Sequence, residues 1–269
     1  MPELPEVETI ARRIQQSPFI IGQTIQDLQA HTSQASPLDA KSIIGCQIKS
    51  VSRRGKQILF TLDNEHTLVV HLMLTGQLIL RPAEKPLRRI TRYSLHFTNG
   101  RRLDLDDPKG IAKVNLCANL EQYFEKLGVE PLSAGFNCDY LYEIFQQSKR
   151  NVKAALVDQK IVAGIGNTYA DEILFTAQVH PKSKTCQLTH IRVKAIVDAA
   201  KKILQDSIDH GGADSDWAYL KGSYPLKVYN QQGEPCVRCG TPINQTTLNG
   251  RATFFCPVCQ SLPIGEDNT

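Results

Sequence analysis

Apolar and polar positions alternate along much of the chain between residues 47 and 106. Short runs rich in β-branched and aromatic residues follow one another there, and Asn99-Gly100 separates two of them with a strong hairpin-turn signal. Several short strands at close spacing predict a sandwich or small barrel. The expected strands are residues 57–62, 67–74, 77–80, 93–98 and 101–105.

A helical period surrounds this β-rich region. Leu4, Val7, Ala11 and Ile14 recur at helical spacing near the start of the chain. Beyond residue 132 the pattern predicts helices over residues 140–147, 152–158, 169–177 and 189–210. Residues 127–132, with a glycine and a proline, read as a linker, and the polar tail 263–269 is expected to fray.

The composition is that of an ordinary soluble protein, with 41% hydrophobic and 22% charged residues. No apolar run is long enough for a membrane span, and no secretory pattern opens the chain, so no membrane partner is expected. A net charge of +4 weakly favours a polyanionic partner, and a mildly basic enzyme explains it as well.

The positive charges gather in groups of the kind that phosphate contacts require, although solvated surface charge explains about half of such groups equally well. The groups are Arg53, Arg54 and Lys56; Arg88, Arg89 and Arg92; Arg101 and Arg102; and Lys149, Arg150 and Lys153.

The chain opens with Met1-Pro2-Glu3-Leu4-Pro5-Glu6. Removal of Met1 would leave Pro2 as a terminal secondary amine, which titrates near pH ~8 and is partly uncharged at neutral pH. Such an amine can attack an aldehyde-like sugar carbon and form an iminium ion, with Glu3 as the adjacent proton acceptor. Prolines at a helix start explain the same residues without any chemistry. Glu3 and Glu6 would share a helix face.

Four of the eight cysteines form two C-x-x-C knuckles separated by sixteen residues. This spacing predicts a closed four-cysteine site for one structural zinc ion, and a redox dithiol is the weaker alternative. The expected ligands are Cys236, Cys239, Cys256 and Cys259. Arg251 follows an Asn249-Gly250 turn in the intervening hairpin, either poised for a phosphate or simply exposed.

A second motif is a glycine turn between two predicted helices. Gly164-Ile165-Gly166-Asn167 follows the helix that contains Lys153, and Asn167 or Thr168 can cap the next helix. The N–H groups of such a helix start suit a phosphate, which Lys153 would reinforce. Many helix pairs have glycine turns and bind nothing.

Taken together and in this order, these motifs resemble the formamidopyrimidine-DNA glycosylase family, which is related to endonuclease VIII. The resemblance covers residues 1–262. It rests on the opening Pro2-Glu3-Leu4-Pro5-Glu6-Val7-Glu8, on Lys56 within a strand run, on the glycine turn and on the finger with Arg251.

The resemblance implies a two-lobed α+β fold with DNA between the lobes. The expected parts are an N-terminal helix plus β-sandwich domain over residues 1–126, a linker over 127–132, a helix–two-turn–helix DNA-binding domain over 133–230 and a zinc-finger β-hairpin over 231–262. The partner would be double-stranded DNA with a damaged or abasic site. A monomer located in the bacterial cytoplasm, at the nucleoid, is expected.

The implied activity is base-excision repair. Members flip the damaged nucleotide out of the duplex. Pro2 would attack C1′, Glu3 would act as acid and base, and Glu6 would support the site. The iminium would then allow β- and δ-elimination, leaving a one-nucleotide gap. The residues expected to hold phosphates are Lys56, Lys153, Asn167 and Arg251.

The chain departs from the family where side chains fill the gap left by the flipped base. Leu74 stands in place of a methionine, and Lys109 and Ile111 replace an arginine and a phenylalanine. The capping loop between Gly212 and Cys236 is also short, with residues 221–224 as its remnant. We therefore expect lyase chemistry on abasic sites or oxidised bases, with a weakened preference for 8-oxoguanine. The alternatives are a catalytically silent binder of damaged or bent DNA and a zinc-ribbon protein that acts in transcription or in protein contacts.

Overall fold

The structure is a computed structural model that describes residues 1–31, 40–213 and 222–262. Its chain forms two compact units, the first of residues 1–2 and 7–126 and the second of residues 3–6 and 127–269. The assignment of residues 3–6 to the second unit was not foreseen from the sequence. The expected frayed tail at 263–269 lies outside the described residues.

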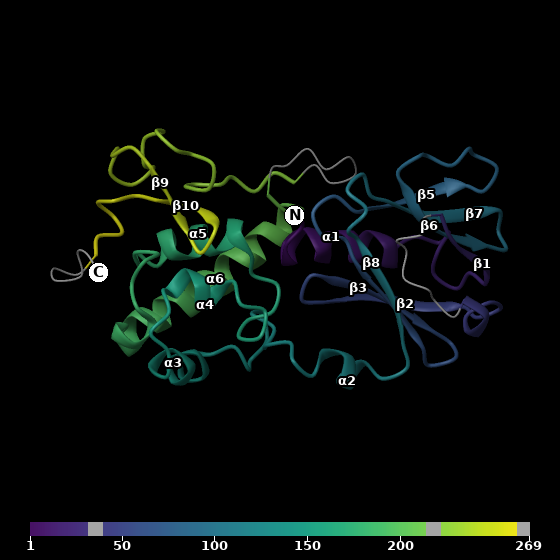
Figure 1. Cartoon of the computed structure of the whole chain (residues 1–269), viewed down its shortest axis with the longest axis horizontal. Helices are drawn as coiled ribbons and strands as arrows, with labels where there is room; N and C mark the ends of the chain where they lie inside the picture. The colour runs from purple at the N-terminus through teal and green to yellow at the C-terminus, as the bar shows by residue number, and fades with distance from the viewer. Residues whose placement is uncertain (32–39, 214–221, 263–269) are drawn as a thin grey trace. The chain divides into compact units, whose positions relative to one another are not determined.

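The first unit is a sandwich of two antiparallel four-stranded sheets, as the alternating pattern predicted (Figure 1). All five expected strands form, and three further strands were missed. One sheet has the order β1 (Ile25–Ala30), β6 (Thr91–Phe97), β7 (Arg101–Asp106) and β5 (Gln77–Pro82). The other has the order β2 (Ile48–Arg54), β3 (Gln57–Leu62), β4 (Thr67–His71) and β8 (Lys113–Cys117).

Both sheets bury one face in a shared apolar core. Leu95 and Leu103 pair across β6 and β7 and enter this core with Phe60 of β3. Helix α1 (Leu4–Gln15) adds Val7 and Ala11 to the same cluster. The opposite face of the second sheet is covered by the short helix α2 (Leu120–Phe124), which packs on Leu59 and Val69 with Cys117. A short helix η1 (Ala40–Ser42) precedes β2.

The second unit is helical, as expected, and ends in a β-hairpin. Helices α3, α4, α5 and α6 enclose a core around Tyr169, Ile173 and Leu204. Asn residues cap α3 and α4 with their side chains, and Thr189 caps α6. The elements are α3 (Cys138–Gln146), α4 (Val152–Leu156), α5 (Asn167–Thr176), η2 (Thr185–Gln187), α6 (His190–Asp209), β9 (Asn244–Leu248) and β10 (Arg251–Phe255).

The segment expected to be a linker is bonded into the second unit. Gly128 donates its N–H to the Gln159 carbonyl at 2.7 Å, and Val129 forms a parallel bridge with Val162. A Cβ at Gly128 would lie 2.4 Å from the carbonyl of Ile161, so only glycine fits there. Within the described residues, no helix has the length and apolarity that crossing a membrane requires.

Candidate active site

The Glu3 carboxylate caps the start of helix α5. It accepts hydrogen bonds from the N–H groups of Gly166 at 2.6 Å, Thr168 at 2.9 Å and Tyr169 at 3.4 Å. The N-cap residue, Gly166, has no side chain for this role. Free N–H groups and the helix dipole stabilise an anion at such a position. The carboxylate that directly follows Pro2 is therefore buried, at 3% exposure, and fixed in place.

Glu6 holds the backbone beside Pro2. Its carboxylate accepts the Glu3 N–H at 2.9 Å, the Tyr169 hydroxyl at 2.6 Å and the Ala213 N–H at 2.9 Å. The Tyr169 hydroxyl also contacts Ser207 Oγ at 2.6 Å. Burial raises the pKa of Glu6, and the hydrogen bonds from Tyr169 and Ala213 oppose that rise. Sequence reasoning missed Tyr169, whose only signal is a hydroxyl-bearing aromatic just after the glycine turn.

Lys56 lies in the turn between β2 and β3 rather than inside a strand run. Arg54 pairs with Gln57, so Gly55 and Lys56 form a two-residue loop, and Gly55 takes the positive φ of 56° that such loops need. Arg53 fixes this hairpin by an ion pair of 2.8 Å with Glu8 of α1. Lys56 is buried, at 7% exposure, in a turn anchored at both strands.

His71, at the end of β4, is a neighbour of Lys56 that sequence reasoning also missed. Burial, followed by the charges of Lys56 and Lys113, lowers the pKa of His71 to about 4. The neutral ring accepts the Met73 N–H at Nδ1 over 3.0 Å. His71 therefore adds no positive charge at neutral pH and shapes the turn that carries Leu74.

Lys153 lies beside Asn167, since both donate to the Ala252 carbonyl, and its phosphate contact stays a prediction. Its ammonium is buried, at 2% exposure, and lies 2.8 Å from Asp171 Oδ1, 2.8 Å from Thr253 Oγ1 and 2.9 Å from the Ala252 carbonyl. The predicted phosphate contact would require it to leave all three partners. Lys153 instead ties helix α4 to α5 and to β10.

Asn167 and Asp171 complete the attachment of the hairpin to helix α5. Asn167 Nδ2 donates to the Ala252 carbonyl at 2.8 Å, and Asp171 Oδ2 accepts the Phe254 N–H at 3.0 Å. Burial raises the pKa of Asp171 to about 7, while the Lys153 ammonium opposes this.

Arg251, the first residue of β10, is exposed and has no side-chain partner among the described residues. Asn167 is thus bonded to the residue that follows Arg251, and the phosphate contacts of both stay predictions.

Arg251 also lines a recess of about 700 Å³ in the second unit. Four further cations surround it, and only Asp158 supplies a negative charge, which pairs with Arg150 at 2.8 Å. The other cations are Lys149, Lys160 and Lys184. Of the predicted group Lys149, Arg150 and Lys153, two members line this recess, and Lys149 has no ion pair within the described residues.

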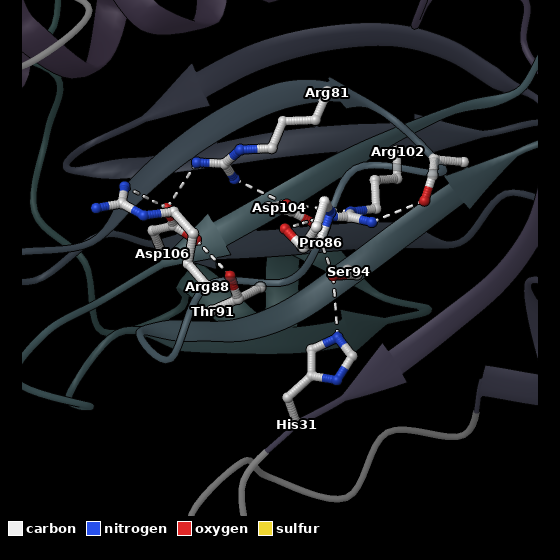
Figure 2. Close-up of polar contacts among 10 residues, drawn as sticks. His31, Arg81, Pro86, Arg88, Thr91, Ser94, Arg102, Asp104 and Asp106 are labelled. Atoms are coloured by element: carbon white, nitrogen blue, oxygen red, sulfur yellow. Dashed lines mark hydrogen bonds and ion pairs between the residues drawn. The ribbon is translucent and has the colours of Figure 1, made fainter.

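One arginine from each of two predicted basic groups, Arg88 and Arg102, instead belongs to a buried ion-pair cluster of the first unit (Figure 2). Arg102, at 3% exposure, bonds Asp104 at 2.9 Å and the Ala83 carbonyl at 2.8 Å. Arg88 pairs with Asp106 at 3.0 Å, and Arg81 bridges both aspartates at 2.7 and 2.8 Å. Arg102 is therefore not available to bind a phosphate, contrary to the prediction. Arg88 is less available than predicted.

The residues predicted to fill the base gap lie on two turns of the first unit. Leu74, 43% exposed, sits between β4 and β5. Lys109 and Ile111 lie between β7 and β8, and Lys109 is exposed. Thr75 Oγ1 donates to the Asp107 carboxylate, so the two turns are joined. Of the predicted loop remnant 221–224, residue 221 lies outside the described residues, and Tyr224 bridges to Ala213.

The four knuckle cysteines meet in one cluster. Their Sγ atoms all lie within 4.8 Å of one another, with Cys236 and Cys259 at 3.9 Å and Cys239 and Cys256 at 3.5 Å. Tetrahedral zinc with Zn–S bonds of about 2.3 Å requires S–S separations of about 3.8 Å. The cluster fits one structural zinc ion. Four protein ligands leave no position open for substrate.

Two side chains attach this zinc centre to helix α5. Arg238 donates to the carbonyls of Phe175 at 2.9 Å and Thr176 at 3.1 Å, and its guanidinium lies 4.5 Å from the Phe175 ring centre. Gln260 accepts the Cys256 N–H at 3.0 Å and donates to the Val179 carbonyl at 2.9 Å. A zinc ion at this centre would therefore stabilise the β9–β10 hairpin, whose second strand begins with Arg251.

Comparison with known proteins gives three family matches along the chain. Residues 1–114 match the formamidopyrimidine-DNA glycosylase N-terminal domain, and residues 127–217 match the H2TH domain of the same enzyme. Residues 233–262 match a zinc finger found in FPG and IleRS.

Relatives of the same family match nearly the full length of the chain. The formamidopyrimidine-DNA glycosylase of Herpetosiphon aurantiacus is 36% identical, over 97% of this chain and 100% of the relative. Lactococcus lactis Fpg, solved with DNA containing an abasic site, is 32% identical with a TM-score of 0.89, covering 97% of this chain and 100% of that one. MutM, solved with DNA containing carbocyclic 8-oxo-G, is 31% identical with a TM-score of 0.90 and the same coverage.

Proposed function

The chain belongs to the formamidopyrimidine-DNA glycosylase family and is a base-excision repair DNA glycosylase, and from this premise we propose that it also cleaves the strand as an abasic-site lyase through an iminium ion at Pro2. The observation that carries the proposal is the fixed Glu3 carboxylate. It directly follows Pro2, is held by three N–H groups of α5, and has its own N–H held by Glu6.

In the proposed first step, a bond from C1′ to the Pro2 nitrogen replaces the bond from C1′ to the base. Once Met1 has been removed, the Pro2 nitrogen attacks C1′ of the flipped nucleotide. The bond from C1′ to the base nitrogen breaks, and the base leaves with a proton. Opening of the sugar ring then gives the iminium, and the Glu3 carboxylate accepts and returns the protons of this step.

The iminium then serves as an electron sink. Loss of a proton from C2′ breaks the C3′–O bond and releases the 3′ phosphate, which is the β-elimination. A second proton loss breaks the C5′–O bond in the δ-elimination, and water frees the amine from the sugar fragment. No step requires redox chemistry or a metal, so the zinc keeps a structural role.

We further propose that phosphates of double-stranded DNA are held by Lys56, Asn167 and Arg251. Arg251 is exposed beside a recess lined with further cations, which supports its part. Lys153 enters this proposal as a positioning residue for the hairpin, because its ammonium is buried against Asp171 and Thr253. The enzyme is proposed to act as a monomer.

The proposed substrates are abasic sites and oxidised bases. The solved relatives hold abasic-site DNA and carbocyclic 8-oxo-G DNA, which supports both classes. Leu74, Lys109 and Ile111 cannot reproduce aromatic stacking or the forked arginine contact. We therefore propose a weaker preference for 8-oxoguanine opposite cytosine.

Borohydride trapping on an abasic-site duplex tests the lyase proposal. The wild-type protein should form a covalent adduct, and Pro2→Gly should form none while still binding the duplex. Glu3→Gln keeps the shape of the carboxylate and should slow adduct formation strongly. Binding of the abasic duplex by the wild-type protein without any adduct would reject the lyase and favour a silent binder.

A further inference from the structure

We propose that the Asp107 carboxylate is a positioning group that locks the turn carrying Leu74 to the turn carrying Lys109 and Ile111, and that this lock sets how strongly the base opposite the damaged site affects the reaction. The inference rests on the proposed function, because it assigns these turns to the DNA interface.

Asp107 begins the second turn and is completely buried, at 0% exposure. It accepts the N–H groups of Ala112 at 2.7 Å and Lys109 at 3.2 Å, which fold the turn around the carboxylate. It also accepts the hydroxyl of Thr75 from the first turn. Burial alone would raise the pKa of Asp107, but these hydrogen bonds outweigh it and lower the pKa. One ionised group therefore organises both turns.

The first turn is shaped to meet this carboxylate. Met73 takes a left-handed φ of 53° and donates its N–H to His71. A Cβ at Gly76 would lie 2.5 Å from the Leu72 carbonyl and 3.0 Å from Ala112 Cβ, so the two turns touch where Gly76 has no side chain. The Thr75 hydroxyl and this glycine contact hold the turns together.

The base of the second turn is rigid as well. Asp106, which ends β7, accepts hydrogen bonds from Arg81, Arg88 and Thr91 in the cluster of Figure 2. Arg92 donates to the Asp107 carbonyl at 2.9 Å. The buried cluster thus fixes the strand end from which the turn starts, and Thr75 remains as the side-chain link across to the first turn.

A fixed link matters because side chains that act on one base step must keep a set separation, to within about 0.5 Å. Leu74 is exposed on one turn and Lys109 on the other. Without the Thr75 hydroxyl, the ladder pairs His71–Lys113 and Gln77–Asp106 still hold the bases of the two turns, and the side-chain link between the turns above these bases is lost. Discrimination between opposite bases should then fall.

The test compares Thr75→Val, which has the same shape without the hydroxyl, with Thr75→Ser, which restores it. The exposed Thr98, whose hydroxyl has no partner in the described part of the chain, supplies the matched control Thr98→Val. Initial rates of borohydride trapping are measured on duplexes with an abasic site opposite each of the four bases. We expect the ratio of fastest to slowest rate to fall about tenfold in Thr75→Val and to stay within twofold of the wild type in Thr75→Ser and Thr98→Val.

The outcomes separate the two proposals. A wild-type protein that forms no adduct on any duplex overturns the proposed function. An active wild type without dependence on the opposite base, or a Thr75→Val ratio equal to that of the wild type, overturns only the lock. Should thermal unfolding show that Thr75→Val is misfolded, Asp107→Asn, which keeps the shape and one acceptor oxygen, is measured instead, with the same expected fall.

Discussion

The Lys153 ammonium lies 2.8 Å from the Asp171 carboxylate, and both side chains are buried, at 2% and 1% exposure. Removing one member of a buried ion pair leaves an uncompensated charge, which costs about 3–5 kcal/mol. We expect Lys153→Met to lose stability in this range in urea unfolding of the zinc-loaded protein. The double variant Lys153→Met/Asp171→Asn should lose less than the sum of the single variants, with a coupling of about 1–3 kcal/mol.

Lys160→Met is the matched control for this pair. It removes an exposed lysine close by in the chain and should change the free energy of unfolding by less than about 0.5 kcal/mol. Additive effects of the Lys153 and Asp171 substitutions would show that the buried pair is not a coupled unit.

The hydrogen bond from Tyr169 to Glu6 predicts a stability effect that depends on pH. The pKa of Glu6 is raised in the folded state, so its contribution is complete below the unfolded value of 4.5 and is lost as the pH rises through the folded value. Tyr169→Phe removes a group that lowers this pKa, and the pKa rises further. Tyr169→Phe should therefore be more destabilising at pH 8 than at pH 5, as measured by chemical denaturation.

Tyr142→Phe provides the comparison for that experiment. The Tyr142 hydroxyl has no hydrogen bond within the described residues, and its removal should have an effect that is small and equal at the two pH values. An equal loss for Tyr169→Phe at both values would contradict the proposed link to Glu6.

The lowered pKa of His71 predicts a pH dependence of stability opposite to that of Glu6. Its pKa falls from 6.5 to about 4 on folding, so its contribution is present above pH 6.5 and is lost as the pH falls toward 4. The loss of unfolding free energy from this group should reach at most about 3 kcal/mol. His71→Asn, whose amide oxygen can accept the Met73 N–H, should flatten this part of the stability profile. A His71 ring signal that titrates near pH 6.5 in NMR spectra would contradict the burial of the neutral ring.

Removal of zinc should release the β9–β10 hairpin, whose second strand begins with Arg251. Structural zinc sites contribute folding free energy directly, about 10–16 kcal/mol in isolated finger peptides. A metal-sensitive dye should detect one zinc ion per chain after denaturation. Cys239→Ser should lower both the zinc content and the melting temperature, whereas Cys186→Ser, a cysteine outside the cluster, should keep the full zinc content.

Local patterns predicted five strands of the first unit, the main helices and the zinc cluster because each depends on residues close in sequence. The two knuckles bring Cys236 and Cys259 together through one short hairpin. The contacts of Glu6 could not be predicted in this way, because Tyr169 and Ala213 lie 163 and 207 residues away. Such pairings follow from packing of the whole unit.

The arginines of the first sheet show a different kind of error. A charge run suggested a phosphate surface, but Arg102, Asp104 and Asp106 alternate on one strand face and so point to internal pairing. That signal was present in the sequence. Lys153 gave no such signal, since its partner Asp171 follows a glycine turn whose geometry the sequence left open.

The capping of helix α5 by Glu3 changes what counts as a separable domain in this chain. Arg238 satisfies the last carbonyls of the same helix, so residues from near opposite ends of the polypeptide hold its two ends. A fragment that starts at residue 127 would include all the helices of the second unit. It would lack the Glu3 carboxylate that caps the start of helix α5. Cutting the chain before residue 127 would divide a folding unit, because the N-terminal peptide is a structural part of the second unit, as the zinc centre is.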